Sequence, residues 1–230
     1  MQTGNDRRVR AGEAGFSLIE LMVALGVTLV IMVIASRMLA MSMAVRTREN
    51  QRSEAVADVQ RALQSMTREI SNAGLGLSSA DGSPNNGLVA ADSGPLAIRV
   101  RTNLNSFCSA ATAATVDGCD SDTTDAGEDL VFALINNVDA AGQLQSLITR
   151  QDVNSSNAIS PLANRVDELK FKYYASDGTE TADASDAQKV EITVTVTLPA
   201  VGKSGQAGYQ PASQMQVVSQ AVLRNLLLSQ

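Results

Sequence analysis

A long apolar segment near the N-terminus constrains this chain more than any other feature. It follows a short basic leader that ends at Gly15, and residues 21–35 contain no charge and only one polar side chain, Thr28. As a helix, residues 16–36 would measure roughly 31 Å at about 1.5 Å per residue, which matches a hydrocarbon core of about 30 Å. The sequence therefore predicts a membrane-spanning helix over residues 16–36.

One carboxylate, Glu20, lies inside this apolar segment, five residues after Gly15. A charged side chain at the centre of a membrane helix costs about 2.5–3.5 kcal/mol, so it needs a partner or a function. Gly15, Phe16 and Glu20 together resemble the prepilin signal of type IV pilins and of the pseudopilins of type II secretion.

The resemblance implies a specific maturation pathway. A prepilin peptidase in the membrane would cut between Gly15 and Phe16 and methylate the new amino group of Phe16. Glu20, at mature position five, would guide packing into a filament. The leader would stay in the cytoplasm, and the following domain would lie in the periplasm before it enters a pilus or pseudopilus.

Two other interpretations of the apolar segment are open. It could be an ordinary membrane anchor, or a secretory signal peptide cut near residues 42–44. The 15 residues from 21 to 35 are long for a signal peptide, and the helical pattern continues beyond them. These observations argue against the signal peptide. The occurrence of Gly15, Phe16 and Glu20 together at the required offsets favours the prepilin interpretation over both alternatives.

The helical pattern continues as an amphipathic segment over residues 37–73. Apolar residues recur there at spacings of three and four, at Val56, Val59, Leu63, Met66 and Ile70, as on one face of a helix. The sequence of residues 72–74, Asn-Ala-Gly, predicts the helix end. Residues 74–95 are rich in Gly, Ser, Asn and Pro and predict a loop.

The rest of the chain predicts strands. Alternation is strictest at residues 189–198, and residues 214–226 change phase between Val217 and Val218, which predicts a bulge. The predicted strands are 96–101, 129–135, 146–151, 166–174, 189–198 and 214–226. We expect an α+β fold that resembles pilins, with the long N-terminal helix packed on a C-terminal antiparallel sheet.

This pattern predicts four parts of the chain. They are a leader (1–15), a transmembrane and assembly helix (16–36), its amphipathic continuation (37–73) and a β-rich globular domain (74–230).

Composition excludes several function classes. The chain of 230 residues has a formal net charge of −6, no His and no Trp. A histidine-based catalytic triad or a histidine-ligated zinc site is therefore impossible. An acidic chain without a basic stripe argues against nucleic acid as the main partner. No catalytic constellation is present in the sequence, so we expect neither an enzyme nor a cofactor.

Residues 108–129 contain two candidate sites. Cys108 and Cys119 have ten residues between them, and outside the cytoplasm they would form a disulfide, the alternative being two unpaired thiols. Asp120, Asp122 and Asp125 are weak calcium candidates, because their spacing of 1, 3, 6 is not the 1, 3, 5 of an EF-hand. A solvated acidic loop is favoured, and no metal site is expected.

Residues 202–205, Gly-Lys-Ser-Gly, look superficially like part of a phosphate-binding loop. The upstream glycine of that motif and the helix that should follow it are missing from the pattern. The segment therefore predicts a turn.

Three later segments resemble the PilW-type minor pilins and the related minor pseudopilin J. They are residues 68–74, 166–178 and 222–225. Arg37, at mature position 22, departs from the proline that many major pilins carry there. The resemblance implies a minor pilin that primes or caps a type IV pilus. Its partners would be other pilins, the prepilin peptidase, the inner-membrane assembly platform and the membrane. The alternatives are a minor pseudopilin of type II secretion and a membrane-anchored periplasmic binding module.

Overall fold

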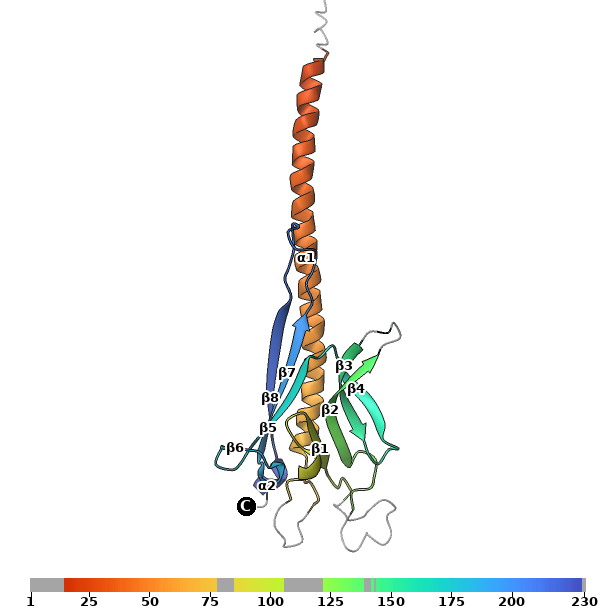
Figure 1. The fold of residues 1–230 in the computed structure, drawn as a ribbon, viewed down its shortest axis with the longest axis vertical. Coiled ribbons are helices and arrows are strands. Elements are labelled where there is room, and N and C mark those ends of the chain that lie inside the picture. The colour runs from red at the N-terminus through yellow and green to blue at the C-terminus, as the bar shows by residue number, and fades with distance from the viewer. Residues whose placement is uncertain (1–14, 78–84, 106–121, 139–141, 143, 229–230) are drawn as a thin grey trace, which may run out of the picture.

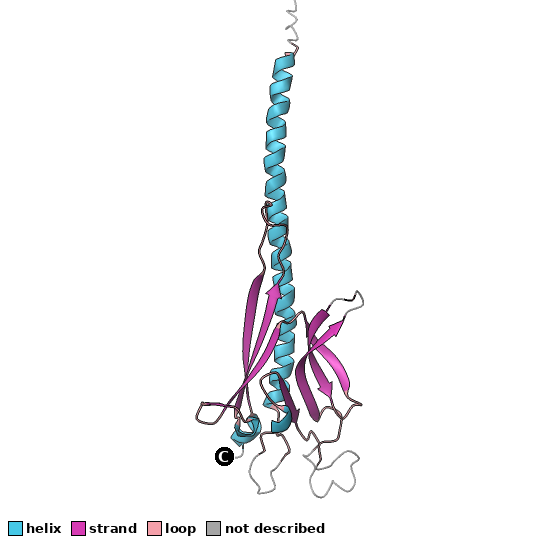
Figure 2. Cartoon of the chain, viewed as in Figure 1, coloured by secondary structure: helices cyan, strands magenta, loops and turns pink. Residues whose placement is uncertain are grey.

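The protein is elongated, with one long helix that projects from a β-rich domain (Figures 1 and 2). The computed structural model describes residues 15–77, 85–105, 122–138, 142 and 144–228. Helix α1 (Leu18–Ser71) contains 54 residues. Its C-terminal half packs between two sheets, and its N-terminal half stands clear of them. This arrangement confirms the predicted α+β fold.

Helix α1 ends where the sequence predicts. The backbone N–H of Asn72 donates to the carbonyl of Arg68, and Gly74 then adopts a positive φ of 79°. A Cβ at Gly74 would lie 2.1 Å from the carbonyl oxygen of Asn85, so glycine is needed both for the backbone angle and for the close approach.

The strands form two four-stranded antiparallel sheets rather than the single sheet that was expected. The first has the order β1-β2-β3-β4, with bounds Ala97–Arg101, Asp129–Val138, Leu144–Asp152 and Ala158–Asn164. The second has the order β6-β5-β7-β8, with bounds Glu180–Thr181, Glu168–Tyr174, Lys189–Leu198 and Ser213–Val222. Short helices complete the described fold: η1 (Ala90–Asp92), η2 (Ala184–Asp186) and α2 (Arg224–Leu228).

One core joins α1 to both sheets. The predicted apolar stripe supplies Val59, Leu63, Met66 and Ile70, all buried. The first sheet contributes Ile98, Phe132 and Ile148, and β7 contributes every second residue from Val190 to Leu198. The strict alternation of β7 therefore reflects one face on the core and one face toward solvent.

The last predicted strand is wrong in two respects. β8 ends at Val222 and α2 begins at Arg224, whereas the strand was predicted to continue to residue 226. The predicted bulge is also absent, because β7 and β8 pair without a register shift along their whole length. Two successive valines fit a regular strand because Val217 faces the core side, while Val218 is 51% exposed.

A buried carboxylate joins the first two strands. Asp129 opens β2, and its side chain is 4% exposed. It accepts two hydrogen bonds of 2.7 Å from Arg99 and one of 2.8 Å from Arg101, both on β1. Burial alone would raise the pKa of Asp129, but the hydrogen bonds and charges of Arg99 and Arg101 outweigh it and lower that pKa.

We expect Asp129→Asn to destabilise the domain by about 2 kcal/mol at neutral pH, because Arg99 then keeps only its ion pair with Asp92 and Arg101 loses its buried counter-charge. Since the pKa of Asp129 is lowered in the folded state, its contribution is present above about pH 4 and disappears as the pH falls through the folded-state value. Thermal unfolding of detergent-solubilised protein, followed by circular dichroism from pH 7 to pH 3, measures both effects. The exposed Asp167→Asn is the matched control; an equal loss in both variants, or a loss independent of pH, contradicts the prediction.

Candidate functional site

The candidate site is the uncovered N-terminal half of α1. Among the described residues, α1 is the one helix long and apolar enough to cross a membrane. Its most apolar window has a mean hydropathy of 2.7, and none of that window is buried by the rest of the chain. Thr28 and Ser36 donate their hydroxyl hydrogens to the carbonyls of Ala24 and Met32. These polar side chains are therefore satisfied within the helix, as a lipid or helix-bundle environment requires.

The segment just before α1 is extended and accessible. Ser17 has φ −67° and ψ 142°, and its carbonyl accepts the first helical hydrogen bond from Leu21 at 3.1 Å. Phe16 is 83% exposed, and a Cβ at Gly15 would meet no atom within 4 Å. An enzyme can therefore reach the backbone at Gly15 and Phe16 without moving any other described part of the chain.

Glu20 lies in the first turn of α1. A negative charge is favourable there, because the N-terminal end of a helix carries a partial positive charge. Its side chain is exposed, and within the described part of the chain it forms no ion pair. The described part of the chain therefore supplies no cationic partner for Glu20.

The sequence did not reveal how the domain is fastened to the helix. The β7–β8 connection rises along α1 (Figure 1), and the Arg48 guanidinium donates hydrogen bonds to it. Its acceptors are the carbonyls of Leu198 (3.2 Å), Pro199 and Pro211 (3.0 Å) and the hydroxyl of Ser213 (2.6 Å). An arginine on a predicted helix gives no sign of such contacts, because the acceptors lie about 150 residues away.

The tip of this connection touches α1. Residues 202–205 form a turn, as predicted, with Gly202 and Gly205 at positive φ. Gly208 packs so closely that a Cβ there would lie 3.1 Å from the carbonyl oxygen of Ala40. The loop and the helix are thus held together by Arg48 at one point and by Gly208 at another.

The other predicted sites remain predictions. Cys108, Cys119 and Asp120 lie outside the described residues. Asp122 accepts hydrogen bonds from Thr124, whose hydroxyl and backbone N–H lower the pKa of Asp122. Asp125 accepts one from Asn105 at 2.8 Å. Within the described residues, no three His, Cys, Asp or Glu side chains gather as metal ligands.

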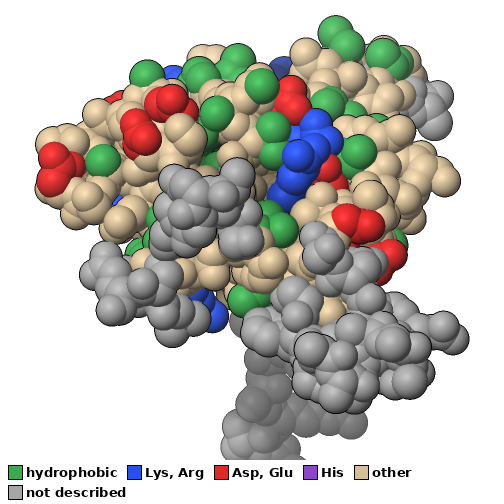
Figure 3. All heavy atoms as spheres, turned by 90° about the horizontal axis from the view of Figure 1, so that it is seen from below, with side chains coloured by type: hydrophobic (Ala, Val, Ile, Leu, Met, Phe, Trp, Pro, Cys, Tyr) green, Lys and Arg blue, Asp and Glu red, His purple; other side chains and the backbone are tan. Residues whose placement is uncertain are grey.

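Charge on the visible end of the domain is mixed. Figure 3 shows acidic and basic side chains scattered over this face, without a broad patch of either sign. The described part of this face therefore offers no extended basic surface of the kind that binds a phosphate backbone.

Comparison with known proteins identifies the N-terminal motif. Residues 10–36 match the family model of the prokaryotic N-terminal methylation motif, which includes Gly15, Phe16 and Glu20. The match supports a type IV pilin-like protein, a pilin or pseudopilin subunit whose role is structural. Together with the apolar half of α1, it indicates membrane anchoring with the remaining domain outside the cytoplasm.

Over the whole chain, the similarity to known proteins is low. A type IV-like pilin from Thermus thermophilus has 10% sequence identity and a TM-score of 0.40, over 74% of this chain and 97% of that protein. A likeness of this degree carries no information on function. A comparison with curated proteins finds no match.

Proposed function

We propose that this chain is a minor pilin, cut between Gly15 and Phe16 by a prepilin peptidase, that helps to prime or cap a type IV pilus. The observation that supports this best is the methylation motif directly in front of a helix half that its own domain leaves bare. Burying each apolar side chain of that half is worth about 1.5–3 kcal/mol. The membrane would cover it before assembly, and neighbouring pilin helices would cover it afterwards.

Glu20 gives the proposed assembly its register. After processing, the amino group of Phe16, on this subunit or on its neighbour, is the nearest cation to the Glu20 carboxylate. In a low-dielectric bundle an unpaired charge is costly, so a subunit shifted along the axis would be disfavoured. The inner-membrane assembly platform would lift the subunit into place.

A role as a minor pseudopilin of type II secretion rests on the same motif and the same bare helix. The third possibility is that the helix only tethers a periplasmic binding module. The three roles differ in where the mature chain accumulates and in what its loss prevents.

Deletion of the gene, followed by complementation with a C-terminally tagged chain, tests the proposal. We expect the deletion to reduce surface pili strongly, and sheared pilus fractions to contain small amounts of the tagged mature chain. Normal piliation combined with a failure to secrete proteins would support the pseudopilin role instead. If piliation and secretion are both normal and the chain is confined to membranes, the result would favour the role of a tethered binding module.

A further inference from the structure

β8 is the one long sheet edge among the described strands that has no protection. The edge of β1 is covered by the segment that follows α1: Leu88 bridges Val100, and the N–H of Arg101 donates to the carbonyl of Gly87 at 2.7 Å. β4 contains Pro161, which has no N–H to donate. At the other edge of the second sheet, β6 covers two residues of β5, and the N–H of Phe171 on β5 donates to the carbonyl of Pro95 at 2.9 Å. β8, in contrast, has ten residues and pairs only with β7.

The register shows which backbone groups of β8 face the open edge. The N–H of Leu223 donates to the carbonyl of Gln188 at 2.9 Å, and the β7–β8 pairing is regular. Hydrogen-bonded pairs alternate in an antiparallel ladder, so the odd-numbered residues of β8 bond to β7. The even-numbered residues direct their N–H and C=O groups outward: Gln214, Gln216, Val218, Gln220 and Val222.

Nothing in β8 discourages another strand from pairing with this edge. Residues 213–222 contain no charge and no proline, and the strand has no bulge. Exposed sheet edges normally carry a charge, a proline or a bulge that prevents pairing with another strand. Val218 and Val222 are 51% and 43% exposed, so two apolar side chains also lie beside the open edge.

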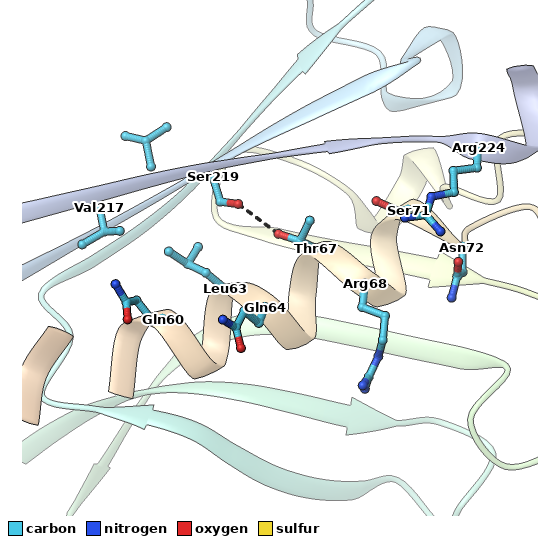
Figure 4. Close-up of a pocket in the computed structure, with 11 residues that line it drawn as sticks. Gln60, Leu63, Gln64, Thr67, Arg68, Ser71, Asn72, Val217, Ser219 and Arg224 are labelled. Atoms are coloured by element: carbon cyan, nitrogen blue, oxygen red, sulfur yellow. Dashed lines mark hydrogen bonds between the residues drawn. The ribbon is translucent and has the colours of Figure 1, made fainter. Parts of the chain in front are cut away.

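A groove runs between this edge and α1. It has a volume of about 800 Å³ and is lined by one face of α1 from Gln60 to Asn72 and by residues 217–219 of β8. The hydroxyls of Thr67 and Ser219 are 3.1 Å apart at its floor (Figure 4). A strand added to β8 would therefore lie along α1, with alternate side chains facing the Gln60, Gln64 and Thr67 side of the helix.

The charge of the groove indicates the chemistry of its occupant. Its lining contains two arginines, Arg68 and Arg224, and no carboxylate, although the chain as a whole carries −6. Arg224 lies at the end of the groove where α1 finishes, and the Arg68 side chain, about one turn earlier, points away from β8 in the view of Figure 4. Arg68 contacts Glu69 at 2.9 Å, and Arg224 has no ion pair within the described part of the chain. An acidic residue fits this end.

We propose that the open edge of β8 accepts an extended segment of a different protein chain as an added antiparallel strand. The segment would be free of basic residues and would carry an Asp or Glu near its N-terminal end, opposite Arg224. This proposal goes beyond the proposed function and does not depend on it, because a tethered binding module would use the same edge.

A second copy of this chain fits the edge poorly. β8 runs alongside α1 in the same direction, so antiparallel pairing of two β8 strands would point the two apolar helix halves in opposite directions. Parallel pairing would bring the two Arg68–Arg224 ends together, and like charges repel. Two β8 strands therefore fit each other poorly, and the occupant that we propose is a different chain.

Selection from a phage library of random ten-residue peptides, against the full chain in detergent, tests the proposal. We expect enriched peptides to alternate apolar and polar residues and to carry an acidic residue near the N-terminus. Val218→Pro removes one outward N–H but no bond to β7, and should weaken their binding by about tenfold or more. Val218→Thr keeps the N–H and should bind like the unmodified chain.

Arg224→Glu provides the second variant. It should reverse the charge preference, so that peptides with Lys in place of the acidic residue bind better, and circular dichroism verifies that each variant is folded. The proposal is overturned if no peptides are enriched, or if they bind the Val218→Pro and Arg224→Glu variants as well as the unmodified chain. Self-association that Val218→Pro abolishes would also overturn it, because the occupant would then be a second copy.

Discussion

Replacing Gly15 with leucine is expected to leave all of the chain as uncut precursor in the membrane. The resemblance to prepilins implies that the peptidase approaches the backbone closely at the residue before the cut, where a side chain would obstruct it. The Gly15→Leu change carries no folding penalty of its own, because a Cβ at this position meets no atom within 4 Å. A loss of processing would therefore report on the enzyme and not on misfolding.

Intact-mass measurement and N-terminal analysis of membrane-extracted protein would detect this effect. The unmodified chain should begin at an N-methylated Phe16, and the Gly15→Leu variant should begin at Met1. Gly26→Leu is the matched control, since Gly26 also has no atom near its Cβ position and should be processed normally. A mature protein that begins near Val45 would show signal-peptide cleavage and would rule out the prepilin interpretation.

Glu20→Ala should give a chain that is processed and inserted normally but is at least about tenfold depleted from filaments. A tenfold loss corresponds to about 1.4 kcal/mol, a modest part of what a charge pair in a dry helix bundle can contribute. The described chain offers Glu20 no cation, so the loss should not affect the fold of the subunit itself.

Complementation of a deletion strain measures this effect, with surface pili scored beside the membrane level of each variant. Glu20→Asp keeps the charge and should restore assembly in part. If Glu20→Ala supports normal piliation, Glu20 has no assembly role and the simple-anchor interpretation gains support.

The parts of the fold that the sequence predicts are those in which one face is buried over many residues. The stripe from Val59 to Ile70 and the alternation in β7 are two such patterns, and both are confirmed. β4 was not predicted because its first four residues are exposed, so burial imposes no alternation on them. The division into two sheets falls between β4 and β5, which follow one another after three residues but do not pair, and local patterns do not show which successive strands pair.

Part of the candidate site could likewise be predicted from the sequence, and part could not. Gly15, Phe16 and Glu20 could be found because they are close together in the sequence and their spacing is itself the motif. The contacts of Arg48 and the open edge of β8 could not be found, because they depend on the tertiary placement of the β7–β8 connection. The predicted bulge was wrong because a solvent-exposed valine looks, in sequence alone, like a core valine.

The attachment of the β7–β8 connection to α1 has a mechanical consequence. Gly208 meets the helix at Ala40, four residues beyond the end of the predicted membrane span, and Arg48 fastens the base of the connection about two turns further on. The domain is therefore held against α1 at both points and is not joined to it by a flexible linker. A pull along the helix axis is transmitted directly to the domain, and a push on the domain is transmitted along α1 to its apolar N-terminal half.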